Sequence, residues 1–490
     1  MTYAEAIKFL LGLQMFGARL GLENTLRLAA LAGNPQEKLR FIHVAGTNGK
    51  GSTCAMLESI YRAAGLRTGL YTSPHLVHFG ERIQVDRQPI GEADIARLAS
   101  EMKLFLAGFP PEAHPTFFEV VTVMALRYFA EQKCELVIWE TGLGGRLDAT
   151  NIVTPLASVI TNIQFDHQAW LGDTLPRIAA EKAGIIKPGV PVITAVDDRD
   201  ALRVLFETAR ALHSPFSLIT RAQTEIPPLR DLELPLPGKH QRLNAAVAVY
   251  TARAVADKIP VSDETIRGGL QKVKWAGRLQ LIERIIPGEK ISSSSPQPSP
   301  PLRGREGDAD ALRRRPPYSS LSPIGGAGEG EGAACSIPTG SDYRFTVQKI
   351  LLDGAHNIGG AEALRAAWLS YFPTANATLI LGVLRDKDYG RICEILAPLA
   401  GRILLVPIES QRTALPHELA PACRAANPRA EIIEAKSLAE ALKLADRDPL
   451  VVIAGSLYLI GEALELLKLS TETPSNERNL NEWTAKPSKK

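Results

Sequence analysis

The chain has 490 residues and a mass of 53.1 kDa, which is more than one ordinary hydrophobic core holds and enough for two or three domains. Hydrophobic residues make up 45% and charged residues 22%, a composition typical of globular proteins that excludes a wholly disordered, collagenous or fibrous chain. The 56 basic and 53 acidic residues leave a net charge of +3, so the charge balance gives no reason to expect nucleic acid or a membrane surface as a partner.

The N-terminus and the cysteines both indicate a cytoplasmic protein. The first seventeen residues have no basic lead and no small-residue cleavage site, and they contain Glu5 and Gln14, which favours an amphipathic helix over a secretion signal. No stretch of the chain reaches the roughly 18 uninterrupted apolar residues of a membrane span. An odd number of scattered cysteines without a C-x-x-C pattern predicts reduced thiols rather than disulfides or zinc, namely Cys54, Cys134, Cys335, Cys393 and Cys423.

The first two hundred residues alternate between strand and helix patterns. An apolar run at 41–46 ends in glycine, and a helical pattern follows at 50–65. Further strands are predicted at 68–72, 135–140, 157–163 and 190–196, and a further helix at 238–256. These strand runs are apolar on both faces, which is typical of a parallel sheet covered by helices. We predict an N-terminal α/β domain over residues 1–286.

The composition then changes twice. Residues 287–343 are rich in Ser, Pro, Gly and charge and cannot bury enough apolar surface to offset the entropy of ordering, so a disordered insertion is predicted there. It is either a neutral inserted repeat or a binding linker. Strand and helix patterns resume over 344–470 and predict a second α/β domain with a mostly parallel sheet. The polar residues 471–490 predict a flexible tail.

The segment GTNGKGS at 46–52 follows a predicted strand and opens a predicted helix. In that context glycines let backbone N–H groups turn around an anion, and the helix N-terminus adds partial positive charge. Lys50 can reach the β- and γ-phosphates of a nucleotide, and the hydroxyl of Ser52 or Thr53 can bind Mg²⁺. The spacing departs from G-x-x-x-x-G-K-[ST], so a tight strand–helix turn is the alternative to a phosphate loop. An ATPase or GTPase switch also stays open on this pattern.

Nine segments in order point to one family: GTNGKGS, YTSPHL (71–76), ETGLGGRLDATN (140–151), DH (166–167), EKAGIIKPG (181–189), GKHQRLNAA (238–246), WAGRLQ (275–280), LDGAHN (352–357) and AGSLYLIGE (454–462). Together they closely resemble the folylpolyglutamate synthase/dihydrofolate synthase family, a branch of the Mur-type ATP-dependent amide ligases. The likeness covers about residues 3–286 and 346–468. The loop alone marks the wider superfamily, whereas GLGGRLDATN, EKAGI and DGAHN are more specific to the folate branch.

The resemblance implies a fold and a reaction. It implies an N-terminal P-loop-type ATPase domain with a mostly parallel sheet and a C-terminal Rossmann-like glutamate-ligase domain. ATP is the implied co-substrate, with two Mg²⁺ ions, and L-glutamate is added to a folate or to dihydropteroate through an acyl phosphate. Lys50 and the ions would neutralise the repulsion between an anionic carboxylate and the γ-phosphate. Lys50, Lys182 and His356 are the implied catalytic residues.

The resemblance also implies the metal ligands, which are Ser73, Glu140, His167 and Lys182. Glu140 ends a predicted strand and Ser73 precedes a proline, so without the resemblance each is a solvated strand end or a turn. His167 alone is more often structural, since Mg²⁺ prefers oxygen ligands. In this family the matching lysine is carbamylated by CO₂, so the resemblance implies a carbamate at Lys182 that can bind a metal ion; the reaction requires a neutral amine, and the alternative is a surface charge cluster on a helix.

The remaining implied contacts belong to the nucleotide and the acid substrate. The ATP contacts are Gly49, Lys50, Gly51, Ser52, Asn244, Arg278 and Asp353. Ser456 and His356 lie near the incoming glutamate or the transferring phosphate. Thr116, Phe117, Phe118, Glu119 and Leu147 match the pterin side, although phenylalanine in a helix more often belongs to the core.

Two rival functions remain at this point. One is a Mur-type cell-wall ligase with a nucleotide-linked muramyl substrate, which the early position of the phosphate loop at residue 46 disfavours because it leaves no separate N-terminal UDP-binding domain. The other is a nucleotide switch or transport ATPase that hydrolyses ATP without folate and glutamate. A monomer is the default expectation for the oligomeric state.

Overall fold

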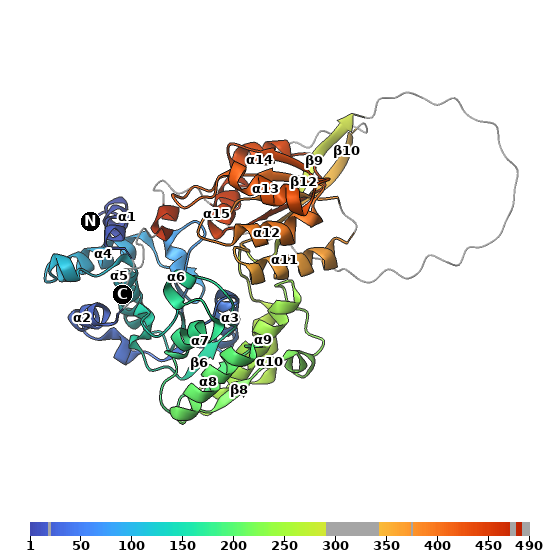
Figure 1. Cartoon of the computed structure of the whole chain (residues 1–490). Helices are drawn as coiled ribbons and strands as arrows, with labels where there is room; N and C mark the ends of the chain where they lie inside the picture. Colours follow the sequence, from blue (N-terminus) through green and yellow to red (C-terminus); the bar gives the residue numbers. More distant parts are fainter. Residues whose placement is uncertain (18–20, 291–342, 374–375, 471–476, 483–490) are drawn as a thin grey trace, which may run out of the picture. The chain divides into compact units, whose positions relative to one another are not determined.

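The computed structural model describes residues 1–17, 21–290, 343–373, 376–470 and 477–482 (Figure 1). The chain divides into two compact units, one of residues 1–283 and 348–490 and one of residues 284–347. The described part of the second unit consists of residues 284–290 of strand β9 and 343–347 of strand β10. The functional site lies in the first unit.

The N-terminal half is built on an eight-stranded sheet with the order β4-β3-β2-β5-β1-β6-β7-β8. Strands β2, β5, β1, β6, β7 and β8 are parallel, and β3 and β4 add an antiparallel edge. The strands are β1 Phe41–Ala45, β2 Thr68–Tyr71, β3 Ile83–Val85, β4 Gln88–Pro89, β5 Leu136–Glu140, β6 Ala157–Ile160, β7 Val192–Thr194 and β8 Phe216–Leu218.

Helices cover both faces of this sheet because its central strands are apolar on both sides. Helices α9 and α10 lie beside α3, and α7 lies beside α8 (Figure 1). The α-helices are α1 Tyr3–Gly12, α2 Glu23–Leu31, α3 Lys50–Ala63, α4 Glu92–Leu106, α5 Phe117–Glu131, α6 Gln168–Leu171, α7 Leu175–Ala183, α8 Arg199–Ala211, α9 Lys239–Ala254 and α10 Asp263–Gln271. The 3-10 turns are η1 Leu13–Phe16, η2 Pro35–Lys38, η3 Phe79–Arg82, η4 Pro111–Ala113, η5 Ala149–Ile152 and η6 Arg221–Glu225.

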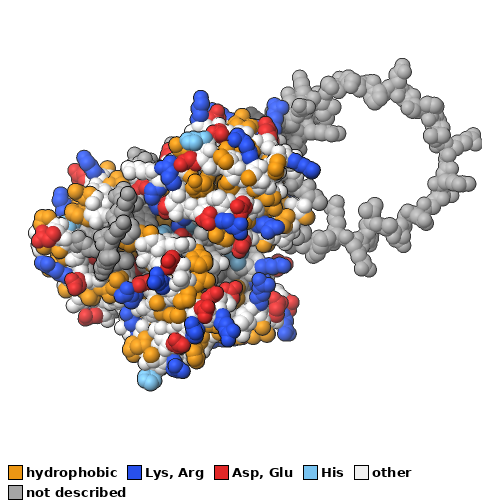
Figure 2. Space-filling model, viewed as in Figure 1, with side chains coloured by type: hydrophobic (Ala, Val, Ile, Leu, Met, Phe, Trp, Pro, Cys, Tyr) orange, Lys and Arg blue, Asp and Glu red, His pale blue; other side chains and the backbone are white. Residues whose placement is uncertain are grey.

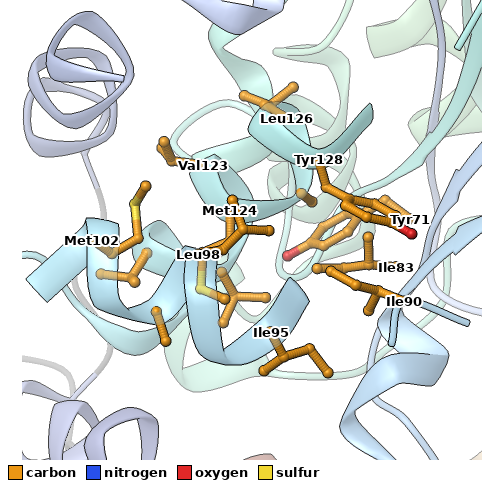
Figure 3. Close-up of a cluster of buried hydrophobic side chains, with 14 of the residues drawn as sticks. Tyr71, Ile83, Ile90, Ile95, Leu98, Met102, Val123, Met124, Leu126 and Tyr128 are labelled. Carbon is orange, nitrogen blue, oxygen red and sulfur yellow. The ribbon is translucent and has the colours of Figure 1, made fainter. Parts of the chain in front are cut away.

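The alternation along β1 divides the core into two layers. Phe41 belongs to the cluster that holds helices α4 and α5, whereas Ile42 and Val44 belong to the cluster under α3 and α9. In Figure 3 side chains of α4 and α5, such as Leu98 and Met124, pack together and reach Tyr71 and the other residues of the sheet edge. This two-sided burial fixes which strand ends face the site, since a one-residue slip would reverse every side chain.

The C-terminal half is built on a six-stranded sheet with the order β13-β12-β11-β14-β10-β9, whose first five strands are parallel. Its strands are β9 Gln280–Lys290, β10 Tyr343–Asp353, β11 Thr378–Leu381, β12 Arg402–Leu405, β13 Glu431–Glu434 and β14 Leu450–Ala454. Its helices are α11 Ile358–Tyr371, α12 Tyr389–Leu396, α13 Pro416–Ala426, α14 Leu438–Leu444 and α15 Leu457–Leu466, with η7 Ala397–Leu399 and η8 Glu477–Asn481. Apolar clusters again lie on both faces of the sheet.

The predicted α/β fold with two mostly parallel sheets is confirmed. The structure differs from the expected flexible tail at 471–490, because Glu477–Asn481 forms a 3-10 turn in which Glu477 and Leu480 are 1% exposed. Its buried polar side chains, Glu477 and Asn481, are hydrogen-bonded, which allows them to be buried. The disordered insertion predicted at 287–343 lies almost wholly outside the described residues.

The described cysteines, Cys54, Cys134, Cys393 and Cys423, are free and buried, and Cys335 lies outside the described residues. Within the described ranges, the helices are too short or too polar for any of them to cross a membrane. Acidic and basic side chains are interspersed over the face shown in Figure 2, in keeping with the small net charge.

A buried histidine in β1 makes the fold sensitive to acid. His43 is fully buried, its Nε2 lies 2.9 Å from Thr150 Oγ1, and burial, with the charge of Lys187, lowers its pKa from 6.5 to about 3. Below pH 6.5 the unfolded chain takes up a proton that the folded chain refuses, so this histidine removes stability as the pH falls from 6.5 towards 3. At pH 5 the loss amounts to about 2 kcal/mol.

We therefore expect the free energy of unfolding to fall less between pH 7.5 and pH 5 in the variant His43→Gln than in the unchanged protein. Urea unfolding at both pH values measures the two differences, and any packing cost of the substitution cancels between them. Equal pH dependence in the two proteins would show that His43 is not a source of acid sensitivity.

Candidate active site

A cavity of about 590 Å³ collects the candidate residues of both halves. The carboxyl ends of parallel strands commonly form ligand sites in α/β folds, and here β1, β5 and β6 of the first sheet and β10 and β14 of the second end beside this cavity. All the residues that the resemblance implied line it, whereas Thr53, the alternative to Ser52 as a hydroxyl for Mg²⁺, does not: Gly49, Lys50, Gly51, Ser52, Ser73, Thr116, Phe117, Phe118, Glu119, Glu140, Leu147, His167, Lys182, Asn244, Arg278, Asp353, His356 and Ser456.

The glycine-rich loop between β1 and α3 forms one wall. Gly49 is the N-cap of α3 with φ +83°, a conformation that favours glycine. Gly46 has φ +150°, and a Cβ there would lie 1.9 Å from Thr161 Oγ1. The Thr161 hydroxyl is occupied because it donates to Asn48 O at 2.6 Å. Backbone and side chain therefore fix the loop in a shape that only glycine allows.

We expect Gly46→Ala to abolish nucleotide binding, because the added methyl group must displace Thr161 or the loop. Gly65→Ala is a matched control, since Gly65 also has a positive φ of +86° but nothing lies within 4 Å of its Cβ position. Both variants carry a backbone strain of about 1 kcal/mol. Titration calorimetry with ADP should then detect binding only in the control, and equal affinities would contradict the role of the loop.

Two lysines converge on the carbonyl of Gly46. Lys50 Nζ donates to Gly46 O and Thr47 O, each at 3.2 Å, and Lys182 Nζ donates to Gly46 O at 2.8 Å. Lys182 lies on α7 and is 3% exposed. Burial first, and then the nearby charge of Lys50, lower the pKa of Lys182 to about 7. A large share of its amine is therefore neutral near pH 7.

Glu140 places a carboxylate at the end of β5. It is 3% exposed, and its Oε2 accepts from the backbone N–H of Ser73 at 3.2 Å. Burial raises its pKa to about 7, although Lys50 and the Ser73 N–H act in the opposite direction. Burial makes this carboxylate costly to ionise. A cation bound in the cavity would stabilise its charged form, so Glu140 is suited to bind one.

Asp166 joins the two halves, and the sequence analysis did not identify it as a site residue. Its Oδ1 accepts from Lys387 Nζ at 2.5 Å and its Oδ2 from Asn357 Nδ2 at 3.1 Å. Its Oδ2 also lies 3.7 Å from His356 Nε2. Burial alone would raise the pKa of Asp166, but the positive charges that His167 and His356 carry once acid protonates them, and the ammonium of Lys387, hold it well below the usual range.

The two histidines beside Asp166 are held as neutral rings. His356 Nδ1 lies 2.7 Å from Gly354 O, so this nitrogen carries the proton and Nε2 keeps its lone pair. Burial and the charge of Lys387 lower the pKa of His356 to about 4 and that of His167 to about 3. His167 has φ +51°, and its backbone N–H donates to Asp166 Oδ1 at 2.8 Å.

An amide pair also connects the loop to the second half. Asn48 and Asn357 exchange two hydrogen bonds, each of 3.0 Å. Asn48 Nδ2 donates further to Gln164 Oε1 at 2.7 Å, and Asn357 Oδ1 accepts from the N–H of Gly360 at the start of α11. The loop and helix α11 are thus fixed together at the cavity.

The nucleotide candidates form a second hydrogen-bonded chain behind the loop. Asn244 Nδ2 donates to Gln241 Oε1 at 3.0 Å, and Gln241 Nε2 donates to Ser52 Oγ at 3.2 Å. Asp353, at the end of β10, accepts from the N–H groups of Leu279 at 2.8 Å and Ala355 at 2.9 Å. Burial raises the pKa of Asp353, with Arg278 opposing.

The residues expected at the pterin side have distinct local roles. Thr116 and Glu119 form the capping box of α5, in which Glu119 Oε2 accepts from Thr116 N at 2.7 Å. Phe117 lies under the guanidinium of Arg82, whose Cζ is 5.4 Å from the ring centroid. Phe118 fills the space beside Gly142, where a Cβ would lie 2.4 Å from its ring. Leu147 lines the same region of the cavity, and Ser456 caps the N-terminus of α15.

Several lining residues escaped the sequence analysis: Arg82, Asp148, Asp166, Gln164, Lys387, Arg412 and Asn481. Lys387 belongs to the segment RDKD at 385–388, which follows the apolar strand pattern at 377–384, and its charged residues just beyond a strand end were the available signal. For Asn481 the sequence offered no local signal.

Comparisons with known proteins agree with this architecture. Residues 44–252 match the family described as Mur ligase middle domain, and residues 344–457 match Mur ligase, glutamate ligase domain. A dihydrofolate synthase/folylpolyglutamate synthase of Bacillus subtilis is 32% identical over 95% of this chain and 99% of its own length. The chain belongs to the folylpolyglutamate synthase/dihydrofolate synthase family of Mur ligases.

Further relatives and solved structures support the same family. A folylpolyglutamate synthase of Lacticaseibacillus casei is 30% identical over 95% of this chain and 99% of its own. The structure of Escherichia coli FolC in complex with DHPP and ADP has a TM-score of 0.73 at 27% identity and covers 96% of this chain and 98% of that one. A Thermotoga maritima folylpolyglutamate synthase has a TM-score of 0.72 at 29% identity, covering 97% and 98%.

The family predicted from the nine motifs is thereby confirmed, as is the enzyme class, an ATP-dependent acid–amino-acid ligase. The cell-wall ligases share only the superfamily with these relatives. A nucleotide switch is disfavoured, because both Mur ligase domains are matched along the chain.

Proposed function

We propose that this protein adds L-glutamate to folates, and also to 7,8-dihydropteroate, with ATP as the co-substrate. The observation that carries the proposal is the convergence of Lys50, Glu140, His167 and Lys182 with Asp353, His356 and Ser456 around one cavity. The Bacillus subtilis relative is named for both activities, and the Escherichia coli structure contains DHPP and ADP. We extend both activities to this chain.

In this proposal the nucleotide phosphates lie against the loop at 46–52. The N–H groups at the start of α3 and the ammonium of Lys50 supply positive charge where the γ-phosphate meets a carboxylate. Gln241 and Asn244 orient Ser52 and the loop from behind. Arg278 and Asp353 complete the nucleotide site from the second half.

Glu140, Ser73, His167 and Lys182 are the proposed ligands of two Mg²⁺ ions. Among the described residues, no three acidic, histidine or cysteine side chains lie close enough to hold a metal by themselves. This fits Mg²⁺, which is usually bound by one or two carboxylates together with substrate phosphates. The buried Glu140 provides such a carboxylate. When bound, the ions would neutralise the phosphate oxygens and align them with the substrate.

Lys182 fits the set as a carbamate. Its buried amine, with a pKa of about 7, is neutral often enough to attack CO₂. The new N–C bond gives a carbamate anion and releases one proton. The positive charge that Lys182 now adds beside Lys50 would become a negative charge suited to a metal ion.

The reaction then balances as two transfers. The substrate carboxylate takes the γ-phosphoryl group as the bond to ADP breaks, and the resulting acyl phosphate is attacked by the amine of glutamate. The amide bond forms, phosphate leaves with its bridging oxygen, and the amine loses a proton. We assign neutral His356, which lines the cavity and keeps the lone pair on Nε2, to the glutamate and phosphate side.

The test is a reconstituted reaction. Purified protein receives ATP and MgCl₂ with 7,8-dihydropteroate or tetrahydrofolate, with and without L-glutamate. We expect ATP turnover to require both the acid and glutamate, the product to gain a glutamyl residue by mass spectrometry, and EDTA to abolish the reaction. ATP hydrolysis without either substrate, or turnover only with a muramyl nucleotide, would contradict the proposal. Gel filtration of the same sample tests the expected monomer.

A further inference from the structure

The final described segment, residues 477–482, returns to the cavity from the far end of the chain. Leu480, Asn481 and Glu482 line the cavity, and Asn481 is 8% exposed. The matched glutamate ligase domain ends at residue 457, so this segment lies beyond it. Three residues from a stretch that was predicted to be a flexible tail therefore contribute to the cavity wall.

Hydrogen bonds to the N-terminal half hold this segment in place. The backbone N–H of Phe79 donates to Glu477 Oε2 at 2.6 Å, and His75 Nε2 lies 3.0 Å from Glu477 O. Gln14 Nε2 donates to Asn479 O at 2.6 Å. Glu477 and Leu480 are 1% exposed. Buried polar contacts of this kind specify one arrangement rather than a loose association.

Asn481 uses its whole amide group at the centre of this arrangement. Its Oδ1 accepts from Arg82 Nη2 at 2.6 Å, and its Nδ2 donates to His75 O at 2.9 Å. Its backbone carbonyl accepts from Tyr458 OH at 2.5 Å, and Tyr458 belongs to helix α15. One residue thus connects the loop after β2, the turn η3 and the second half of the molecule.

Arg82 is the group that Asn481 orients. It is 3% exposed, its Nε donates to His75 Nδ1 at 2.8 Å, and its guanidinium lies over Phe117. Since His75 Nε2 donates to Glu477, its Nδ1 is the acceptor that Arg82 needs. Both Arg82 and Phe117 line the cavity. The segment 477–482 therefore fixes both hydrogen-bonding partners of this arginine.

The cavity surface beside Arg82 suits the flat aromatic portion of the acid substrate. Phe117, Phe118 and Leu147 offer apolar and aromatic faces, and a planar guanidinium packs well against a flat ring. We infer that Asn481, with segment 477–482, is a positioning residue that holds Arg82 and Phe117 against the flat aromatic portion of the acid substrate. This inference rests on the proposed ligase function and adds a specificity element to it.

The experiment compares steady-state kinetics of four variants and the unchanged protein with 7,8-dihydropteroate or tetrahydrofolate, ATP and glutamate. Truncation after residue 476 removes the segment, truncation after residue 482 is the matched control, Asn481→Ala removes the contact with Arg82, and Asn481→Asp retains an acceptor for it. We expect KM for the acid to rise at least tenfold after residue-476 truncation and about fivefold in Asn481→Ala. The 482 truncation and Asn481→Asp should stay within threefold, and KM for ATP should not change.

Unfolding midpoints of all these proteins separate this role from a structural one. If truncation after residue 476 prevents folding, the test rests on Asn481→Ala, which should raise KM for the acid and leave KM for ATP unchanged. An unchanged KM for the acid in a folded variant, or an equal rise of both KM values, overturns the inference. If the full chain ligates neither acid, the proposed function itself fails, which is a different result from normal ligation that is insensitive to Asn481.

Discussion

Replacing Lys182 by arginine is expected to abolish ligation, with a loss of about 10³-fold in kcat, although the substitution preserves the positive charge. Arginine stays protonated in proteins and cannot form a carbamate with CO₂. Lys182→Met, which removes the charge at similar length, should lose as much. Both variants lack the anion that we propose for this position, and the guanidinium adds a permanent charge beside Lys50.

The matched control lies on the same helix. Arg177 pairs with Asp173 at 2.9 Å, and the two side chains are 70% and 72% exposed, so Arg177→Met should retain full activity. The three variants are compared by their initial rates of glutamate-dependent ATP turnover. Removal of dissolved CO₂ should lower the rate of the unchanged protein, and added bicarbonate should restore it, with no response in Lys182→Met. Retained activity in Lys182→Arg would show that the ammonium, rather than a carbamate, is the functional form.

Much of the fold could be predicted because local patterns determine it. Apolar runs such as 41–46 and 135–140 became β1 and β5, and the glycine-rich loop lies between β1 and α3 as expected. Strand ends were less predictable: β6 stops at Ile160 rather than at residue 163. Beyond Ile160 the chain bonds to the phosphate loop instead, since the Thr161 hydroxyl donates to Asn48 O and Asn162 O accepts from the N–H of Thr47. A sequence pattern does not contain such a partner.

Some residues of the candidate site could likewise be predicted from local patterns, and others could not. Lys50, Glu140 and His356 could be found because each belongs to a motif at a strand end. Asp166 and Lys387, by contrast, are 221 residues apart in the chain, and no local signal pairs them. Glu119 was expected at the pterin side, and the structure shows it in the capping box of α5, a role that the pattern T-x-x-E at 116–119 could have indicated.

The segment 477–482 marks a further limit of composition as a guide. The last twenty residues are polar, and polarity alone favours solvent. Yet Glu477 and Asn481 are buried because Phe79, His75 and Arg82 supply hydrogen-bonding partners. Whether a polar residue is buried depends on partners that are contributed from elsewhere in the fold.

The second large effect concerns the ion pair of Asp166 and Lys387, whose side chains are both 7% exposed. Asp166→Asn leaves the Lys387 ammonium buried without its carboxylate, which is expected to cost about 3–5 kcal/mol of the free energy of unfolding. Lys387→Met alone removes the ammonium that stabilises the Asp166 carboxylate, so it should also lower the free energy of unfolding. The double variant removes both charges together, and replacing a buried pair in this way is often nearly neutral. We therefore expect the double variant to recover most of the stability that Asp166→Asn loses.

Activity should not recover with stability, and this separates the two roles of Asp166. Its carboxylate accepts from the backbone N–H of His167 and also lies 3.7 Å from His356 Nε2, so it positions His167 at the cavity as well as balancing Lys387. Urea unfolding and kcat, measured on the two single variants and the double variant, complete a double-mutant cycle. A double variant that is stable but inactive supports both roles. A double variant as unstable as Asp166→Asn would contradict the ion pair as the source of stability, and one with full activity would remove Asp166 from the site.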